Sequence, residues 1–403
     1  MYSQIKFLFF GKLYIRKMLD IALRRIQMMR RIHIKKLMSC ILACCIITTF
    51  SACKSEKKKG QTEQGNEFEI KVAQNVVDVY MKALMKEDME NAKKLYTKEL
   101  AEKSKEAGKS DLKVKGYSVE ETSEVGRSGF FKIKVTRMSL DKPVATLEEC
   151  SVKVVKEGTD YKIDEVKNET EKEAFLEQDT IRVRSKNNIK TNLLIDSSSF
   201  PQYAFSKDDK GNLSKQIVPR NKFSVMNFGY EGERIAISSY DKDSYIGIIK
   251  IDESMATQGG GGGGGGEGQG EGDQGGGGNK KGSQGSMTRE KPIGKEMTSL
   301  DLLKDAKIEF MTFSNGEKFL VVQYNKSNLG RCIRIYNTDS GELIKEKFEE
   351  KYPYGKVEIV FSSFDKDVVN FEVVQKDMND KAAAELAGKY QMNLKEEFKI
   401  KRL

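Results

Sequence analysis

Histidine and tryptophan are the rarest residues in this 403-residue chain, which has one histidine, His33, and no tryptophan. A Ser-His-Asp or Cys-His arrangement needs an imidazole to carry the proton, and many metal sites are built on imidazole ligands. Because His33 lies near the N-terminus, the 350 residues after Cys53 contain no histidine. The sequence therefore excludes these nucleophilic arrangements, and every histidine-ligated metal site, from that part of the chain.

Cysteine is also scarce where a folded domain is expected. Four of the six cysteines lie close together near the N-terminus, namely Cys40, Cys44, Cys45 and Cys53. The other two, Cys150 and Cys332, are far apart and lack the C-x-x-C spacing of zinc and redox motifs. We expect each of these two to fill a strand as a small apolar residue, with a single disulfide between them as the alternative.

Most of the net positive charge comes from the N-terminal stretch. Residues 1–52 hold five Lys, five Arg and one Asp, which accounts for +9 of the formal net charge of +10. The rest of the chain lacks the basic patch of a nucleic-acid-binding protein. The tract 259–278 matches G-x-G-x-x-G only because it is mostly glycine, and Asn279 follows Gly278 where a P-loop has lysine. We expect no nucleic-acid partner, no nucleotide and no cofactor.

The N-terminal stretch has the order of an export signal. Arg30, Arg31, Lys35 and Lys36 precede the apolar run Leu37–Phe50, and Ser51, Ala52 and Cys53 follow it. Small residues directly before a cysteine resemble the lipobox of bacterial lipoproteins, although Phe50 stands where leucine is usual. The resemblance implies that Cys53 is diacylated and becomes the new N-terminus. It also implies a protein that is lipid-anchored on the extracytoplasmic face of the cell membrane.

Two other interpretations of this stretch stay open. The apolar run can be a transmembrane anchor, although its 14 residues are few for a helix that crosses a ~30 Å hydrocarbon core. Alternatively Cys44 is the lipidated residue, after an apolar region of only about seven residues. A leader of conventional length would begin at Met28 or Met29, and we expect the true start there.

Composition divides the chain into segments. Residues 54–67 have no apolar side chain, and this composition predicts a flexible tether. A glycine-rich tract behaves as a random coil, and lengthening a loop by such a tract has a small entropic cost. We expect a leader at 1–52, a tether at 53–67, an α+β domain at 68–168, a β domain at 169–254 and 300–376, a disordered glycine-rich insertion at 255–299, and a tail at 377–403.

The α+β segment begins with helical periodicity and continues with strand periodicity. Apolar residues recur at helical spacing from Ile70 to Leu84, whereas Phe131, Ile133 and Val135 alternate with polar residues. Val76–Leu100 and Gly158–Val166 resemble the opening and the final strand of NTF2-like domains in bacterial lipoproteins. The opening carries an acidic step x-D-x-x-x-A between its two helices, and here Asp88 and Ala92 are the D and the A. In the final strand, Tyr161 stands where tryptophan is common. The resemblance implies an α+β cone.

Enzymes of the NTF2-like class place an acid or a histidine together with a tyrosine inside the cone. No such set can be assigned in this sequence. We expect Asp88 to be a turn or helix-cap residue rather than a catalytic acid, and Tyr80 to pack in the core.

The β segment contains an internal repeat. Gly232–Tyr240 matches Gly316–Tyr324, and Ser238–Asp243 recurs as Ser362–Asp367. Tyr324 and Phe364 are 40 residues apart, as are Phe200 and Tyr240, and this is the length of one propeller blade. Phe313–Lys318 and Ile333–Leu343 resemble a WD40-like or TolB-like blade. The resemblance implies an all-β domain of propeller-blade-like antiparallel repeats, with an unrelated antiparallel sandwich as the alternative.

Two matching turns carry paired carboxylates, Asp241-Lys242-Asp243 and Asp365-Lys366-Asp367. Because neither has the D-x-[DN]-x-[DN]-G loop of a calcium site, we expect solvated turn residues. As a whole the sequence predicts a membrane-anchored, non-enzymatic lipoprotein that binds another envelope protein. The alternatives are an enzyme with a carboxylate/Tyr pair in the cone, and a solute-binding lipoprotein, against which the lack of two alternating α/β lobes argues.

Overall fold

The computed structural model describes residues 67–104, 110–220, 222–255, 290–327, 329–346 and 348–403. The predicted leader, the lipidation candidate Cys53, almost all of the tether and most of the glycine-rich insertion lie outside the described residues. Within the described part of the chain, no helix is both long enough and apolar enough to cross a membrane.

A first sheet contains six antiparallel strands, each paired with the next along the chain. These are β1 Lys113–Val125, β2 Ser128–Met138, β3 Val144–Glu157, β4 Asp160–Glu177, β5 Thr180–Ser185 and β6 Asn192–Asp196. The strand β4 continues well past residue 168, because its later residues pair with β5, beginning with Lys172 opposite Ser185. The domain boundary that we expected at residue 168 therefore falls inside a strand.

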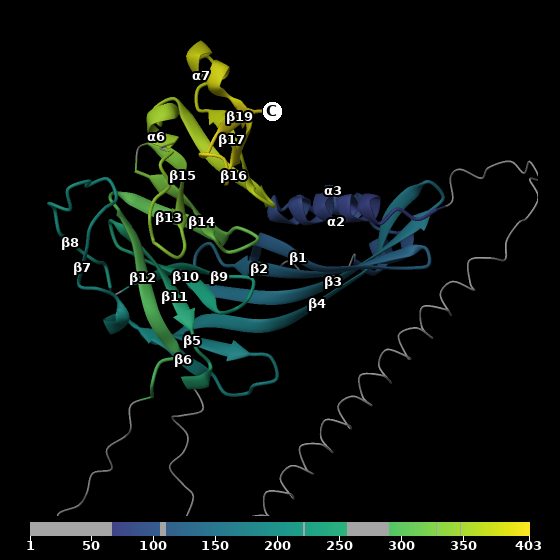
Figure 1. Ribbon diagram of the computed structural model, residues 1–403, viewed down its shortest axis with the longest axis horizontal. Coiled ribbons are helices and arrows are strands. Elements are labelled where there is room, and N and C mark those ends of the chain that lie inside the picture. Colours follow the sequence, from purple (N-terminus) through teal and green to yellow (C-terminus); the bar gives the residue numbers. More distant parts are fainter. Residues whose placement is uncertain (1–66, 105–109, 221, 256–289, 328, 347) are drawn as a thin grey trace, which may run out of the picture. The chain divides into compact units, whose positions relative to one another are not determined.

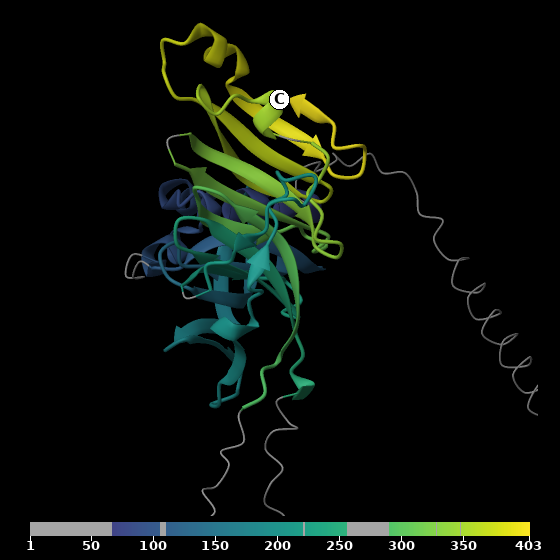
Figure 2. The ribbon, with the colours of Figure 1, turned by 90° about the vertical axis from the view of Figure 1, so that its left-hand side faces the viewer.

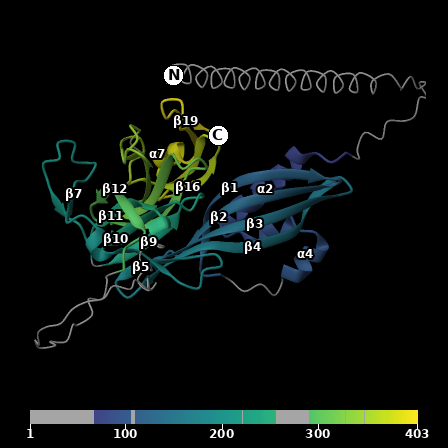
Figure 3. The same cartoon turned by 60° about the horizontal axis from the view of Figure 1, so that its bottom comes forward.

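Among the residues that the structure describes, three helices precede this sheet: α2 Ile70–Met85, α3 Met89–Lys94 and α4 Lys98–Lys103. Figures 1 and 3 show α2 along one face of strands β1 to β4. Its residues Ala73, Val77 and Met81 recur every fourth position and are fully buried, which is the apolar face that the spacing predicts. The strand prediction is confirmed as well, since Phe131, Ile133 and Val135 are all buried in β2.

Three further sheets are antiparallel meanders of consecutive strands. Their strands are β9 Phe223–Phe228, β10 Arg234–Tyr240, β11 Ser244–Ile251 and β12 Gly294–Leu303; β13 Ala306–Phe313, β14 Phe319–Lys326 and β15 Gly330–Asn337; and β16 Val357–Asp365, β17 Val368–Gln375, β18 Gly388–Asn393 and β19 Ile400–Arg402. Figures 1 and 2 show them following one another from teal through green to yellow. This consecutive order is that of propeller blades, so the predicted blade-like β region is confirmed.

Short elements lie between the sheets or, in the case of α7, between two strands of the last sheet. They are the 3-10 turn η2 Ser197–Ser199, the two-stranded hairpin of β7 Tyr203–Ala204 and β8 Gln216–Ile217, and the helices α6 Phe348–Lys351 and α7 Lys381–Leu386. The glycine-rich insertion falls between β11 and β12, and pairing of Gly294 with Ile251 starts β12 before residue 300, where we expected the β domain to resume. The expected tail also folds, because Tyr390 and Met392 of β18 are buried.

The repeat matches equivalent strands only in part. Gly232–Tyr240 and Gly316–Tyr324 each lead into the second strand of their sheets, β10 and β14. Phe364, however, lies in the first strand of its sheet, and Phe200 follows η2 outside any strand. The 40-residue spacing of aromatic residues is therefore no mark of equivalent positions, because the sheets differ in strand number and in the lengths of their connections.

Two hydrophobic cores are joined by the first sheet. One lies between α2 and the sheet, and the other lies among the three later sheets. The second core also takes in residues from the first sheet, including Met138, Leu147 and Ala174. Cys150 and Cys332 are buried and free, one in each core, as small apolar strand residues, which contradicts the disulfide alternative.

Candidate functional site

A cleft of about 850 Å³ lies between the helix-covered sheet and the second and third blade-like sheets. Its lining comes from the end of α2, from β1, from β13 to β17, and from the loops beside them. Small-molecule sites in proteins usually occupy about 300–1,000 Å³ and combine apolar walls with a few polar groups. The volume and the mixed lining of this cleft both fit that description.

Half of the charged residues that line the cleft are in close ion pairs. Lys86 forms an ion pair with Glu372 at 3.5 Å, and Lys113 forms one with Glu87 at 2.8 Å. Arg331 reaches Glu358 with both its Nε and its NH2 at 2.8 Å. The first pair joins the end of α2 to β17, the second joins β1 to the turn after α2, and the third joins β15 to β16. The charges in these pairs are not free to meet a ligand.

Four charged residues that line the cleft lack a close partner of opposite charge among the described residues. Asp141 and Lys307 are exposed to water, whereas Lys115 and Glu309 are partly buried. The ion pair of Lys115 is to Glu87, 4.0 Å away, and burial lowers the pKa of the Lys115 ammonium group. Burial raises the pKa of the Glu309 carboxyl, whose side-chain hydrogen-bond partner is Asn325. Lys115 lies over the ring of Phe310, 5.0 Å from its centroid. The sequence did not point to these residues, because they come together only through packing of β1 on β13.

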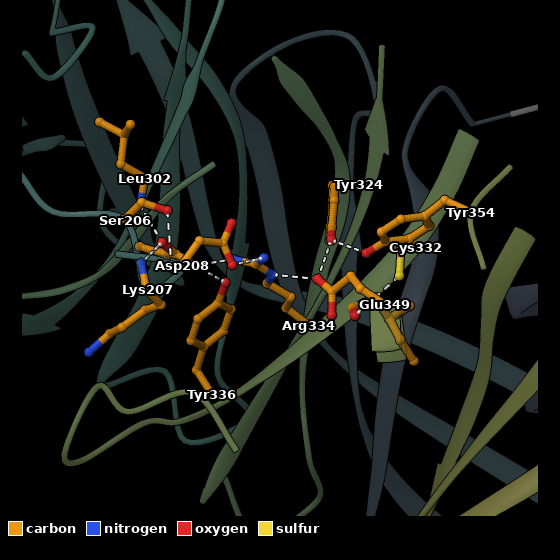
Figure 4. Close-up of polar contacts among 12 residues, drawn as sticks. Ser206, Lys207, Asp208, Leu302, Tyr324, Cys332, Arg334, Tyr336, Glu349 and Tyr354 are labelled. Atoms are coloured by element: carbon orange, nitrogen blue, oxygen red, sulfur yellow. Dashed lines mark hydrogen bonds and ion pairs between the residues drawn. The ribbon is translucent and has the colours of Figure 1, made fainter. Parts of the chain in front are cut away.

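A second polar cluster surrounds Arg334 of β15 (Figure 4). Its guanidinium group contacts Asp301 at 2.8 Å, Asp208 at 2.6 Å and Glu349 at 3.0 Å. The hydroxyl of Tyr336 also donates to Asp301, at 2.8 Å. Only 6% of the Arg334 side chain and none of the Asp301 side chain is exposed. The cluster therefore ties β12, β15, α6 and the β7–β8 hairpin together.

The remaining contacts of the Arg334 cluster are structural as well. Asp301 accepts hydrogen bonds from the backbone N–H groups of Lys207 and Leu302, at 2.8 and 2.7 Å. Burial alone would raise the pKa of the Glu349 carboxyl, but the Arg334 guanidinium group holds this pKa below its ordinary value. Burial raises the pKa of the neighbouring Cys332 thiol to about 12, so it is a poor nucleophile. The sequence contains one signal that could have indicated this cluster, since Arg334 is a charged residue within the otherwise apolar run Cys332–Tyr336.

Tyr80 and Asp88, which we considered as catalytic residues, make other contacts. Tyr80 is buried, and its hydroxyl lies 3.0 Å from that of Tyr96 rather than from a carboxylate. Asp88 caps α3 by accepting from the backbone N–H of Asn91 at 3.1 Å, and hydrogen bonds from Asn91 lower the pKa of its carboxyl. Asp88 is thus a helix-cap residue, as expected.

A tyrosine–carboxylate pair does occur beside the helix, at a position that the sequence did not indicate. The hydroxyl of Tyr117 on β1 donates to Asp78 on α2. Asp78 is held by Lys82 at 2.8 Å, and Lys82 also reaches Asp365 of β16 at 2.9 Å. These contacts fasten α2 to the third blade-like sheet, and neither member of the pair lines the 850 Å³ cleft.

The carboxylates of the two matching turns are more engaged than we expected. Asp243 accepts from the backbone N–H of Asp305 at 2.9 Å, and Asp367 pairs with Lys395 at 2.8 Å. Asp365 takes part in the contact with Lys82 described above. No group of three or more His, Cys, Asp or Glu residues that could hold a metal ion occurs within the part of the chain that the structure describes.

The β7–β8 hairpin carries a concentration of exposed apolar side chains. Exposed fractions are 44% for Tyr203, 39% for Phe205, 89% for Leu213 and 77% for Ile217. Tyr203 and Ile217 are directly opposite each other in the antiparallel pair, so their side chains share a face. Figures 1 and 3 both show the hairpin at an outer end of the β-rich part.

Comparisons with known proteins reveal only distant structural likenesses. No protein-family model and no curated protein matches the chain. Among solved structures, TolB from Acinetobacter baumannii is 8% identical with a TM-score of 0.27, covering 71% of this chain and 57% of TolB. Sqt1 from Saccharomyces cerevisiae is 11% identical with a TM-score of 0.24, covering 70% of this chain and 83% of Sqt1.

Another match is the β-propeller domain of the Trilobed protease from Pyrococcus furiosus, at 10% identity and a TM-score of 0.16, covering 72% of this chain and 96% of that domain. The chain spans about half the length of the first structures it matches, 57% of TolB and 46% of a puromycin hydrolase. Scores of this size assign no function to the chain.

Proposed function

We propose that this chain is a lipoprotein, anchored to the extracytoplasmic face of the cell membrane through acylated Cys53, that binds another envelope protein without catalysing a reaction. In this proposal the helix-covered sheet is an NTF2-like module that serves as a spacer or dimerising unit. The basic residues, the apolar run and the small residues before Cys53 support the anchor. The exposed apolar hairpin is the observation that carries the binding role.

Exposed apolar residues are common when they are scattered, but a cluster on one protruding element is a feature of interaction sites. Leu213 and Ile217 are mostly exposed, and they lie on the same short hairpin as Tyr203 and Phe205. Aromatic residues are enriched among the few that carry most of the binding energy at protein interfaces. A partner that covers this hairpin would remove all four side chains from water.

The loop between β7 and β8 is anchored to buried residues. The backbone N–H of Lys207 donates to buried Asp301 at 2.8 Å, and Arg334 contacts Asp208 at 2.6 Å. A surface that is already ordered loses less conformational entropy when it binds. The Arg334 cluster therefore fixes one end of the loop beside the hairpin strands, which supports a binding role for this element.

The binding role is tested by a pair of matched variants. Leu213→Ser/Ile217→Ser removes two exposed apolar side chains from the hairpin, whereas Ile189→Ser/Met378→Ser removes two with exposed fractions of 97% and 83% elsewhere. Proteins that co-purify with each chain from detergent-solubilised membranes are quantified by mass spectrometry. We expect the hairpin variant to lose a specific partner by about tenfold. Equal recovery from both variants would contradict the binding role.

The anchor is tested separately with the Cys53→Ala variant. Mass spectrometry of the wild-type protein should find an N-terminal peptide that begins at Cys53 and carries acyl chains. The variant should keep its leader and should lack the acyl chains. An unmodified thiol in the wild-type protein, still joined to Ala52, would refute the anchor.

A further inference from the structure

We propose that the 850 Å³ cleft binds a small zwitterion with an apolar side chain, which is the chemistry of an amino acid or a short peptide. This site is separate from the hairpin and goes beyond the protein-binding role. The residues that carry the inference are Lys115 of β1 and Glu309 and Phe310 of β13. Phe361 of β16 completes the apolar wall. The inference depends on a cation, an anion and an aromatic surface that face one cavity.

Lys115 supplies the cation. Only 12% of its side chain is exposed, and its carboxylate partner is Glu87 at 4.0 Å. Glu87 already makes a much closer pair with Lys113, at 2.8 Å. An ammonium group that has lost most of its water and has no close counterion gains strongly from a ligand carboxylate.

Glu309 supplies the anion. Among the described residues it has no ion pair, and the nearest guanidinium group, that of Arg331, is occupied by Glu358 at 2.8 Å. The Asn325 side chain gives Glu309 one neutral hydrogen-bond partner. A ligand ammonium group would provide the missing positive charge. Lys115 and Glu309 attract each other, but this attraction is the smallest of the influences on the pKa of either group. The cleft therefore holds one partly buried and weakly compensated charge of each sign, beside the exposed Asp141 and Lys307.

A β-bulge explains how Glu309 and Phe310 line the same cleft. Successive residues of a regular strand point to opposite faces. In β13, however, Ile308 pairs with Tyr324 of β14, and Phe310 pairs with the adjacent β14 residue, Gln323. Glu309 is therefore an extra residue with no partner on β14. Such an extra residue redirects side chains, and bulges are frequent next to binding sites. Both Glu309 and Phe310 therefore line the cleft.

The apolar surface lies beside the two charges. The ring of Phe310 is beneath the Lys115 ammonium group and packs edge-on against Phe361, with centroids 6.1 Å apart. Ile308 and Leu140 extend this wall. A ligand with a carboxylate on Lys115 and an amine on Glu309 would place an aliphatic or aromatic side chain against these rings.

The experiment measures binding to the full-length protein in detergent by equilibrium dialysis. The probes are leucine, Leu-Leu, N-acetyl-Leu-Leu, which lacks the ammonium group, and Leu-Leu amide, which lacks the carboxylate. We expect saturable binding of leucine, Leu-Leu or both, and at least about tenfold weaker binding of the two blocked forms. If neither leucine nor Leu-Leu binds saturably to the wild-type protein, the proposal is wrong.

Two variants assign the charges. Lys115→Met should weaken Leu-Leu and N-acetyl-Leu-Leu while it leaves Leu-Leu amide unchanged, because only the carboxylate contact is lost. Glu309→Gln should weaken Leu-Leu and Leu-Leu amide while it leaves N-acetyl-Leu-Leu unchanged. The matched controls Lys318→Met and Glu385→Gln alter exposed residues outside the cleft and should bind as the wild type does. An equal effect of all four variants would overturn the site.

Discussion

Replacing Arg334 by methionine tests how the β-rich part is held together. The substitution keeps a long apolar stem and removes the guanidinium group that contacts Asp301, Asp208 and Glu349. Asp208 and Glu349 have side-chain exposures of 55% and 22%, so water compensates part of their loss. Asp301 is wholly buried and becomes a charge without a counterion.

The magnitude follows from that difference in burial. Breaking a buried ion pair by removing one partner typically lowers the free energy of unfolding by about 3–5 kcal/mol. Asp301 keeps three hydrogen-bond donors, from Tyr336, Lys207 and Leu302, which favours the lower end of that range. The control Arg331→Met breaks a pair whose side chains are 40% and 23% exposed, and should cost about 1 kcal/mol or less.

The assay is urea unfolding followed by far-UV circular dichroism, since the chain has no tryptophan for fluorescence. The double variant Arg334→Met/Asp301→Asn should be more stable than Arg334→Met alone by about 0.5–3 kcal/mol, because the uncompensated charge is gone. A loss for Arg334→Met no larger than that for Arg331→Met would refute the reasoning. So would a double variant that is less stable than Arg334→Met.

Two further predictions concern single carboxylates. Burial raises the pKa of Glu309 in the folded state above its ordinary 4.5, so the folded protein binds this proton more tightly than the unfolded chain. Glu309→Gln should therefore raise the urea midpoint of unfolding at pH 7, and this gain in stability should vanish as the pH falls below 4.5. A gain in stability that grows on acidification would contradict a raised pKa. Asp88→Ala removes the N-cap of α3 and should lower the free energy of unfolding by about 1 kcal/mol. An unchanged free energy of unfolding would show that this cap does not stabilise the protein.

Local patterns in the sequence were enough to predict much of the fold. The helical spacing of Ala73 and Val77, and the alternation of Phe131, Ile133 and Val135, depend only on which side chains face a core. The match between Gly232–Tyr240 and Gly316–Tyr324 similarly marked two equivalent strands. Each of these features lies within a few consecutive residues, where periodicity is informative.

The candidate sites depend on contacts that no local pattern contains. Asp208, Asp301 and Glu349 meet at Arg334 from three separate elements, and Lys115 meets Phe310 from a strand almost 200 residues away. The bulge at Glu309 is set by its pairing with β14 and leaves no local mark in the sequence. Tertiary packing therefore creates these sites, and periodicity does not predict them.

Photo-crosslinking in intact cells tests the binding role most directly. A photoreactive residue is placed at Ile217 on the hairpin or, as a matched control, at Met378, whose exposed fraction of 83% is close to the 77% of Ile217. The account predicts one discrete crosslinked envelope protein from position 217, found with the membrane fraction, and none from position 378. Position 217 giving no crosslink, or the same crosslinks as position 378, would contradict it.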